Sequence, residues 1–291
     1  MKYAFIKANR AVFSVQAMCR VLKVHLSGFY AWQKVPLSKR AKENHRLSGL
    51  IKQAWLESGC VYGYRKLHAD LCSFGERCCP NRVLRLSKLA GIKAQIGYRK
   101  RPGQYGGKPA VVAVNRLEQS FDVMMPDCVW VTDITYIRTH EGWLYLAVVI
   151  DLYYRRVIGY SMQERMHMDL VLSALLMAIW RRKPKHRVII HSDQGSQYTR
   201  HEWQAFLNKH NLQASMSRRG NCYDNAVAES FFQLLKRERV RRKIYANRKD
   251  ARDDIFDYIE LFYNTKRKHG KNGMLSHMEF ERQQKWKPLT V

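Results

Sequence analysis

The second half of the chain alternates short apolar runs with longer helical patterns. Runs at 128–137, 143–151 and 155–162 are rich in β-branched and aromatic residues and are joined by short turns, which predicts three strands. The spacing beyond them predicts, in order, a helix at 167–180, a strand at 187–191, a helix at 201–210, a strand at 213–216 and helices at 224–240 and 248–263. This order indicates an α/β fold, with a mixed five-stranded sheet and helices on both faces.

The first part of the chain shows helical spacing only. Residues 15–22 and 26–32 have the pattern of two short helices with a tight joint, which is a helix-turn-helix candidate, although any small helical hairpin gives the same pattern. Apolar faces at 47–55, 64–71 and 83–90 predict three further helices, and Gly91 is placed to end the last one. We expect an all-α region before the sheet.

A composition change separates the two parts. Residues 99–110 (RKRPGQYGGKPA) are rich in Gly, Pro and positive charge, as a linker is. The predicted organisation is a basic helical segment at 1–40, a helix-turn-helix-like domain at 41–98, a linker at 99–122, an α/β core at 123–240 and a basic helical extension of the core at 241–291; the charge and motifs described next predict that the second of these binds DNA and that the core is catalytic.

The charge indicates the kind of partner. The chain has 52 Lys and Arg against 24 Asp and Glu, a net charge of +28. The net charge is +18 over residues 1–110, +2 over 111–229 and +8 over 230–291. A chain this basic favours a polyanion, most often nucleic acid, over the alternatives of a secreted cationic protein or a membrane-surface binder. A nearly neutral middle between basic flanks is typical of a catalytic body with DNA-binding ends.

The basic helical region supplies candidate DNA contacts. The predicted helix at 83–90 would project Arg82, Arg85 and Lys88, as a groove-reading helix requires. The alternative is a helical connector that is merely basic.

Cysteines and apolar runs indicate the compartment. The seven cysteines include no C-x-x-C pair, and the N-terminus lacks a secretory apolar region. The apolar stretches at 144–150 and 171–180 are too short to span a bilayer. We expect a cytoplasmic protein with reduced thiols and no membrane partner.

Three carboxylates are the candidate chemistry. Asp133 lies mid-strand on an apolar face, Asp193 follows a buried strand, and Glu229 lies on a predicted helix, in a D-x59-D-x35-E spacing with Lys236 seven residues further on. Singly, Asp193 could be a loop or capping residue, Glu229 a solvated helix residue and Asp133 a buried hydrogen-bonded acid. Together they suit phosphodiester chemistry, because carboxylates can hold two Mg²⁺ ions that activate the nucleophile and stabilise the leaving oxygen. Lys236 would suit a phosphate contact near the cut end.

The motifs around these residues are specific. The chain resembles the DDE transposase and retroviral-integrase superfamily, and more closely the OrfB product of the insertion-sequence-three family. The matching segments are WVTDITYI (130–137), AVVIDLYYRR (147–156), HSDQGSQYT (191–199), SRRGNCYDNAVAESFF (217–232) and YNTKRKH (263–269). YGYRKLH at 62–68 matches the family's helix-turn-helix region, which adds Arg65 and Lys66 to the candidate DNA contacts.

The resemblance implies an RNase H-like integrase core whose metal ligands and catalytic residues are Asp133, Asp193 and Glu229. It implies supporting roles for Lys236, Asp224 and Asn225, with two Mg²⁺ ions for which Mn²⁺ can substitute. It also implies double-stranded DNA partners (terminal inverted repeats and target DNA), an OrfA product or OrfA–OrfB fusion, and a homo-oligomer on DNA at the bacterial nucleoid.

The chain departs from the family pattern at two positions. Tyr154 stands where a Ser is common, and His277 where a Pro usually follows Ser276. The retroviral HHCC pattern is absent, so we expect no zinc.

The expected function is that of a transposase: metal-dependent DNA cleavage, then strand transfer by a 3′-OH without a covalent protein–DNA intermediate. The main alternative is a catalytically silent DNA-binding regulator of transposition, and another is a nuclease of the same fold that cuts without joining. A tyrosine recombinase is not excluded by residue counts, with 16 tyrosines present, but it would leave the carboxylates unexplained.

Overall fold

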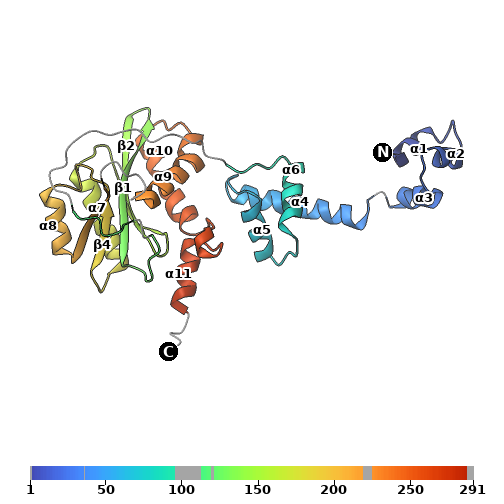
Figure 1. The fold of residues 1–291 in the computed structure, drawn as a ribbon. Coiled ribbons are helices and arrows are strands. Elements are labelled where there is room, and N and C mark those ends of the chain that lie inside the picture. The colour runs from blue at the N-terminus through green and yellow to red at the C-terminus, as the bar shows by residue number, and fades with distance from the viewer. Residues whose placement is uncertain (1, 36, 96–112, 119–120, 219–224, 287–291) are drawn as a thin grey trace. The chain divides into compact units, whose positions relative to one another are not determined.

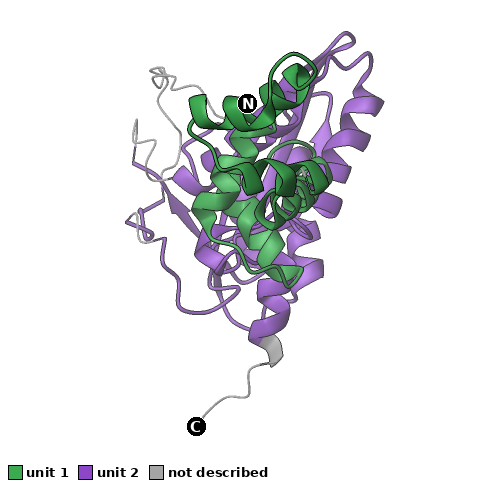
Figure 2. Cartoon of the chain, turned by 90° about the vertical axis from the view of Figure 1, so that its right-hand side faces the viewer, with its two compact units in different colours: residues 1–94 green, residues 95–291 purple. Residues whose placement is uncertain are grey.

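The computed structural model of the chain describes residues 2–35, 37–95, 113–118, 121–218 and 225–286. The chain divides into two compact units, Met1–Ala94 and Gln95–Val291, which Figure 2 shows in different colours. No helix in the described ranges is long and apolar enough to cross a membrane.

The first unit is entirely helical. It begins with α1 (Lys2–Asn9), α2 (Val15–Val21) and α3 (Leu26–Lys34), which surround a small core of Ile6, Met18, Cys19 and Phe29. Ser14 caps α2, because its hydroxyl accepts a hydrogen bond from the Ala17 amide at 3.3 Å. Lys23, between α2 and α3, has a positive φ of 52° and makes the joint tight. The two predicted helices are confirmed, whereas α1, which buries only Ile6, was not predicted from the sequence.

The rest of the first unit contains the three helices predicted from their apolar faces. They are α4 (Lys39–Glu57), α5 (Tyr64–Ser73) and α6 (Pro80–Leu89). Their largest buried side chains include Ile51, Leu67 and Leu71. Gly91 follows the end of α6 with a φ of 67°, the left-handed conformation predicted for it.

The second unit contains a five-stranded sheet. Its strands are β1 (Val129–Thr139), β2 (Gly142–Asp151), β3 (Val157–Gln163), β4 (Val188–Ser192) and β5 (Leu212–Met216), in the spatial order β3-β2-β1-β4-β5. The first three strands are antiparallel neighbours, whereas β4 pairs parallel to β1 and β5 parallel to β4. The predicted mixed sheet is confirmed (Figure 1).

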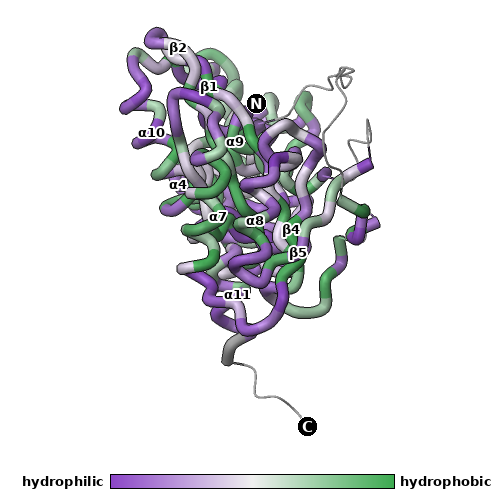
Figure 3. Tube along the Cα trace, turned by 90° about the vertical axis from the view of Figure 1, so that its left-hand side faces the viewer, coloured by the Kyte–Doolittle hydropathy of each residue, from purple (hydrophilic) through white to green (hydrophobic). Residues whose placement is uncertain are grey.

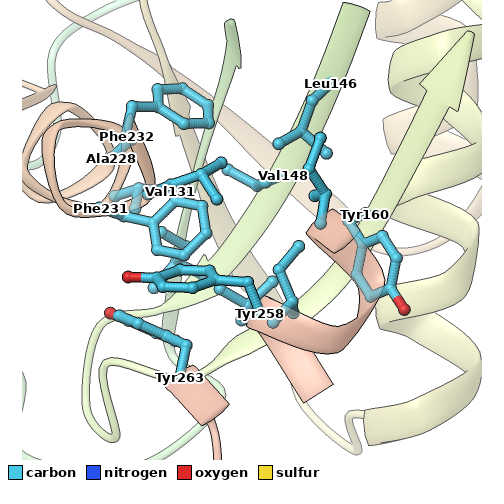
Figure 4. Close-up of a cluster of buried hydrophobic side chains, with 14 of the residues drawn as sticks. Val131, Leu146, Val148, Tyr160, Ala228, Phe231, Phe232, Tyr258 and Tyr263 are labelled. Carbon is cyan, nitrogen blue, oxygen red and sulfur yellow. The ribbon is translucent and has the colours of Figure 1, made fainter. Parts of the chain in front are cut away.

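Helices cover both faces of this sheet. α7 (Met168–Arg182) and α8 (His201–Lys209) enclose one core, which contains Trp130 and Trp203. α9 (Ala226–Glu238), α10 (Arg248–Phe256) and a π-helical stretch (Asp257–Tyr263) enclose the other. Figure 3 shows hydrophobic residues along α7, β4 and β5, and Figure 4 shows Phe231 and Phe232 of α9 beside Val131 of β1.

The interface between α7 and β3 leaves no room for a side chain at Gly159. A Cβ at this position would lie 2.2 Å from the Ala174 carbonyl oxygen and 2.9 Å from the Ala178 Cβ. We expect Gly159→Ala to lower the free energy of unfolding by about 1–3 kcal/mol, the usual effect of overpacking a core. Urea denaturation measures this loss. Gly270→Ala is the control, since its Cβ would meet nothing within 4 Å, and equal stability of both variants would contradict the prediction.

The C-terminal part of the unit packs against the sheet. After α9 come two short 3-10 turns (Val240–Arg242 and Gly270–Asn272) and a final helix, α11 (His277–Trp286). The sequence did not predict α11, because the side chains that it buries, such as Glu281, are charged or polar and give no apolar face. Glu281 on α11 is 3% exposed and accepts hydrogen bonds from Arg156 and Arg182, each at 2.6 Å.

The two departures from the family pattern lie together. His277, at the start of α11, is fully buried, and its Nδ1 lies 2.9 Å from the Tyr154 carbonyl oxygen. Its ring stacks on Tyr263 with centroids 4.5 Å apart, and the Tyr154 ring packs edge-on against Phe280 of α11. Tyr154 and His277 therefore take part in attaching α11 to the loop between β2 and β3.

Candidate active site

The parallel register of β1 and β4 positions two of the predicted carboxylates. Val131 is the last residue of β1 paired with β4, and its partner is His191. Asp133 and Asp193 each follow two residues later, so alternation places both on the same face and at the same level. Adjacent strands lie about 4.8 Å apart, so the two carboxylates are close neighbours where the strands separate.

Backbone amides fix the orientation of both side chains. Asp133 Oδ1 accepts a hydrogen bond from the Ile134 amide at 2.7 Å, and Asp193 Oδ1 accepts one from the Gly195 amide at 2.9 Å. A pocket of about 600 Å³ opens beside them and is lined in part by Asp133, Asp193 and Tyr198.

Helix α9 brings the third carboxylate to this place. Asn225 precedes the helix and is 4% exposed, and its Nδ2 donates to the Thr132 carbonyl oxygen at 3.4 Å, one residue before Asp133. Glu229 follows Asn225 by four residues, which is one helical turn on the same side. Asp224, the other predicted supporting residue, lies outside the described residues.

The helix buries a broader face than the sequence predicted. Of the helical face Val227, Phe231, Leu234 and Leu235, which its apolar spacing predicts as the core side, Phe231 and Leu235 are buried in the core, and Val227 and Leu234 are half-buried and pack against it. Ala228, Phe232 and Glu238 are buried as well. Phe232 packs in the core beside Phe231, with ring centroids 5.6 Å apart.

Electrostatics couple the three acids. Burial raises the pKa of Asp133 well above its usual value, and the charges of Asp193 and Glu229 raise it further. Burial also raises the pKa of Asp193, and burial together with the Asp193 charge raises that of Glu229. Burial therefore disfavours the negative form of each acid, and for Asp133 and Glu229 the neighbouring negative charges add to this effect.

This donor set fits a hard divalent cation. Mg²⁺ takes carboxylate oxygens together with water and substrate oxygens, and it would neutralise the repulsion among these acids. Within the described ranges, no three His, Cys, Asp or Glu side chains form a ready-made metal cage. Asn225 Oδ1 is buried close by and has no hydrogen-bond partner among the described residues, which leaves one more oxygen at the site.

Lys236 lies on the same side of α9, two turns beyond Glu229. Its ammonium lies over the Tyr136 ring, 5.1 Å from the centroid. Burial lowers the pKa of Lys236, and the charge of Arg241 lowers it further, whereas Asp133 acts in the opposite direction. The interaction with Asp133 shows that the lysine is near the carboxylates.

Gly195 provides a sensitive test of the Asp193 geometry. A Cβ on Gly195 would lie 2.9 Å from Asp193 Oδ1, so Gly195→Ala must displace that carboxylate. For the metal-dependent DNA cleavage that the sequence leads us to expect, the rate should fall about 10- to 100-fold in this variant, because small displacements of reacting groups have effects of this size. The melting temperature should stay close to that of the unchanged protein. Gly49→Ala, whose Cβ would meet open space, is the control, and unchanged cleavage by Gly195→Ala would contradict the prediction.

Another buried acid has a structural role. Asp151 ends β2 and is fully buried, and its carboxylate accepts hydrogen bonds from the Tyr154 amide at 3.0 Å and the Asp127 amide at 3.2 Å. Burial raises the pKa of Asp151 to about 6. It shapes the turn between β2 and β3 and is separate from the three carboxylates above.

The predicted DNA-contact residues of the first unit differ in their exposure to solvent and in their contacts within the unit. Arg85, Lys88 and Arg65 are exposed. Arg82 is half-buried, because its guanidinium donates to Asn44 Oδ1 at 2.9 and 3.0 Å and so joins α6 to α4. The Lys66 ammonium lies over the Tyr62 ring, 4.9 Å from its centroid. Arg82 thus links two helices of the same unit. The sequence could not indicate this contact, because it joins residues 38 positions apart.

Family models match most of the chain. An integrase core domain matches residues 124–222, a second integrase core domain matches 229–284, and an HTH-like domain matches 42–101. The HTLV-2 integrase catalytic core domain in complex with magnesium is similar over 54% of this chain and 97% of its own, with 16% identity and a TM-score of 0.43.

Full-length relatives are more similar. Transposase InsF for insertion sequence IS3A of Escherichia coli (strain K12) is 42% identical over 283 residues, which cover 97% of this chain and 98% of the relative. An uncharacterized 31 kDa protein of insertion element IS600 from Shigella sonnei is 38% identical over 263 residues, which cover 90% of this chain and 97% of the relative. The chain therefore belongs to the insertion-sequence-three family of transposases and carries the family's integrase core.

Proposed function

We propose that this chain cuts DNA at the ends of an insertion sequence and joins the freed ends to target DNA. Both steps replace one phosphorus–oxygen bond with another. In cleavage, water forms the new bond to phosphorus while the bond to the 3′ oxygen breaks, which leaves a 5′ phosphate and a free 3′-OH. In joining, the freed 3′-OH forms the new bond to a target phosphorus and loses its proton to solvent, while the bond to the target 3′ oxygen breaks and that oxygen takes up a proton.

One observation carries this proposal: the β1–β4 register brings Asp133 and Asp193 to the same level, and α9 adds Glu229. Asp133, Asp193 and Glu229 would hold two Mg²⁺ ions, or Mn²⁺ in their place, which supply Lewis-acid activation and charge neutralisation. Lys236 would contact a phosphate of the cut strand. Asn225 holds the start of α9 against β1, so it would keep Glu229 in position.

The proposed partners follow from membership of the family, and the charge of the chain supports DNA as one of them. The substrates are double-stranded DNA with the terminal inverted repeats, and target DNA, both in the bacterial cytoplasm at the nucleoid. We further propose that the chain works as a homo-oligomer on DNA, with an OrfA product or as an OrfA–OrfB fusion. The net charge of +18 in residues 1–110 supports DNA binding by the helical unit.

The test is an assay with labelled duplexes that carry the element's terminal repeats. The unchanged chain and its OrfA fusion are each incubated with Mg²⁺ or with EDTA, and cut and joined products are separated by size. We expect joined products that disappear with EDTA and in Asp193→Asn. Asp253→Asn, an exposed acid on α10, is the matched control. DNA binding without cutting by either form would instead identify a regulator, and cutting without joining a nuclease.

Exposed basic residues of α6 should govern DNA affinity. We expect the double replacement Arg85→Ala and Lys88→Ala to weaken binding to duplex DNA and to reduce the slope of log K against log salt by about 0.9 for each phosphate that the protein no longer neutralises. Fluorescence anisotropy at several salt concentrations measures both effects. Lys52→Ala, an exposed lysine on α4, is the matched control. An unchanged slope would show that α6 does not contact the DNA backbone.

A further inference from the structure

The pocket beside the carboxylates has aromatic and apolar walls that phosphodiester chemistry does not require. Besides Asp133 and Asp193, it is lined by Tyr136, Trp143, Tyr145 and Met166. Trp143 is 45% exposed, Tyr136 52% and Met166 46%. Large apolar side chains gathered and exposed in one hollow mark a binding surface.

The sheet geometry brings these side chains together. Tyr136 of β1 pairs with Tyr145 of β2, and Trp143 lies two residues before Tyr145, on the same face. The Tyr136 and Trp143 rings meet edge to face, with centroids 5.1 Å apart and an interplanar angle of 85°. This contact holds the Trp143 ring in place while it stays exposed to the pocket.

The pocket also has polar lining residues that are held in place. Gln197 is 8% exposed, and its amide donates to the Met166 carbonyl oxygen at 3.3 Å. Ser196 donates to Gln197 Oε1 at 3.3 Å, and both residues line the pocket. Aromatic lining residues together with a few polar groups are the combination that binds a flat heterocycle with hydrogen-bonding edges.

We propose that this pocket binds one unpaired nucleobase of the DNA substrate, adjacent to the phosphate held at the carboxylates. This assignment rests on the proposed function, since it needs a DNA strand at Asp133 and Asp193. A volume of about 600 Å³ is ample for one base. A base in the pocket would stack on Trp143, and this stacking would offset the cost of taking it out of the duplex.

A structural role is the competing explanation for the aromatic pair. Cross-strand aromatic contacts stabilise antiparallel strands, and Tyr136 with Trp143 could serve only the β1–β2 hairpin. The two roles differ in their response to the DNA. A stabilising pair is indifferent to base pairing in the substrate, whereas a base pocket is most useful when the base must be taken from a paired duplex.

The test compares cleavage rates of the full chain on two substrates, a fully paired terminal-repeat duplex and the same duplex with a mismatch next to the cut phosphate. We expect Trp143→Ala to cut the paired duplex about tenfold or more slowly, as expected for the loss of base stacking. The mismatch should restore most of this loss, and Trp143→Phe should retain most of the activity. Trp180→Ala is the control, because Trp180 is 71% exposed on α7 and does not line the pocket.

A second measurement does not depend on catalysis. A duplex with 5-iodouracil beside the cut position is bound to full-length Asp193→Asn and irradiated, and the crosslinked peptide is identified by mass spectrometry. We expect a crosslink to Trp143 or Tyr136. The assignment would be overturned if the unchanged chain cuts DNA, Trp143→Ala slows cutting equally on both duplexes or not at all, and no crosslink forms in this pocket. In that case the proposed function would still stand. Absence of any metal-dependent cutting by the unchanged chain would remove the proposed function and this assignment with it.

Discussion

Asp133→Asn should lower cleavage and joining by about a thousandfold and yet make the metal-free protein more stable. The loss follows because a carboxylate that holds the cation contributes several kcal/mol to the transition state, and each 1.36 kcal/mol is tenfold in rate. The gain in stability follows because the Asp133 carboxylate is buried beside Asp193 and Glu229. Burial and these charges raise its pKa, so its negative form destabilises the folded chain. A neutral amide of the same shape removes that repulsion.

The pH dependence of the stability gain has a definite sign. The folded-state pKa of Asp133 lies above the ordinary value of 3.8. At a pH between these two values, Asp133 keeps its proton in the folded chain but has lost it in the unfolded chain. The stability of the unchanged protein therefore falls as the pH rises from about 3.8 through the raised pKa. The advantage of Asp133→Asn should be fully present above the raised pKa and should vanish below pH 3.8.

Thermal unfolding in EDTA across this pH range measures the effect. A gain of 1 kcal/mol raises the melting temperature by about 2–4 °C for a domain of 150–250 residues. Mg²⁺ should raise the melting temperature of the unchanged protein and raise that of Asp133→Asn much less. Asp253→Asn, exposed on α10, should behave like the unchanged protein in every assay. A less stable Asp133→Asn protein at neutral pH would show that the Asp133 charge is compensated in the folded chain.

Glu238→Ala should lower the free energy of unfolding by about 3–5 kcal/mol, the usual effect of removing one partner of a buried ion pair. Glu238 ends α9 and is 2% exposed. Its carboxylate accepts hydrogen bonds from Arg267 Nε at 2.9 Å, from Arg267 Nη2 at 2.8 Å and from the Tyr258 hydroxyl at 2.7 Å. The replacement would leave the guanidinium of Arg267, itself 5% exposed, without its carboxylate.

Urea unfolding followed by tryptophan fluorescence measures this loss, since Trp130 and Trp203 are buried in the same unit. Glu164→Ala is the control, because Glu164 is 55% exposed and its ion pairs with Arg248 and Arg252 are at the surface. A loss below about 1 kcal/mol for Glu238→Ala would mean that water replaces the carboxylate. Cleavage should also fall, because the same helix positions Glu229.

This ion pair gives the tail motif a physical role. Within YNTKRKH, Asn264 is fully buried and uses both amide atoms on Val157: Oδ1 accepts from the amide at 3.1 Å, and Nδ2 donates to the carbonyl oxygen at 3.0 Å. Asn264 thus attaches the tail to the start of β3, and Arg267 attaches it to the end of α9. The motif holds α9, the helix that carries Glu229, against the sheet.

The local pattern was sufficient to predict the strands and most helices. Short runs of apolar, β-branched and aromatic residues predicted all five strands, because helices cover both faces of the sheet and most consecutive strand residues are buried. Alternation along the first strand placed Asp133 with Val131 and Ile137, and the structure buries both of these side chains. The helices at the two ends of the described chain, α1 and α11, were missed because few of their side chains are buried against a core.

The sequence by itself determined the family and the class of fold and predicted the three carboxylates, since these depend on short motifs and on periodicity along the chain. Only the tertiary structure decided that Arg82 is bound to Asn44, that Phe232 lies in the core and that Glu238 pairs with Arg267. It also decided that Tyr136 and Trp143 share a pocket with Asp133 and Asp193. The reason is that these contacts join elements far apart in the sequence or depend on how strands register and separate. A side chain's periodicity fixes the face it occupies, whereas its partner depends on what packs against that face.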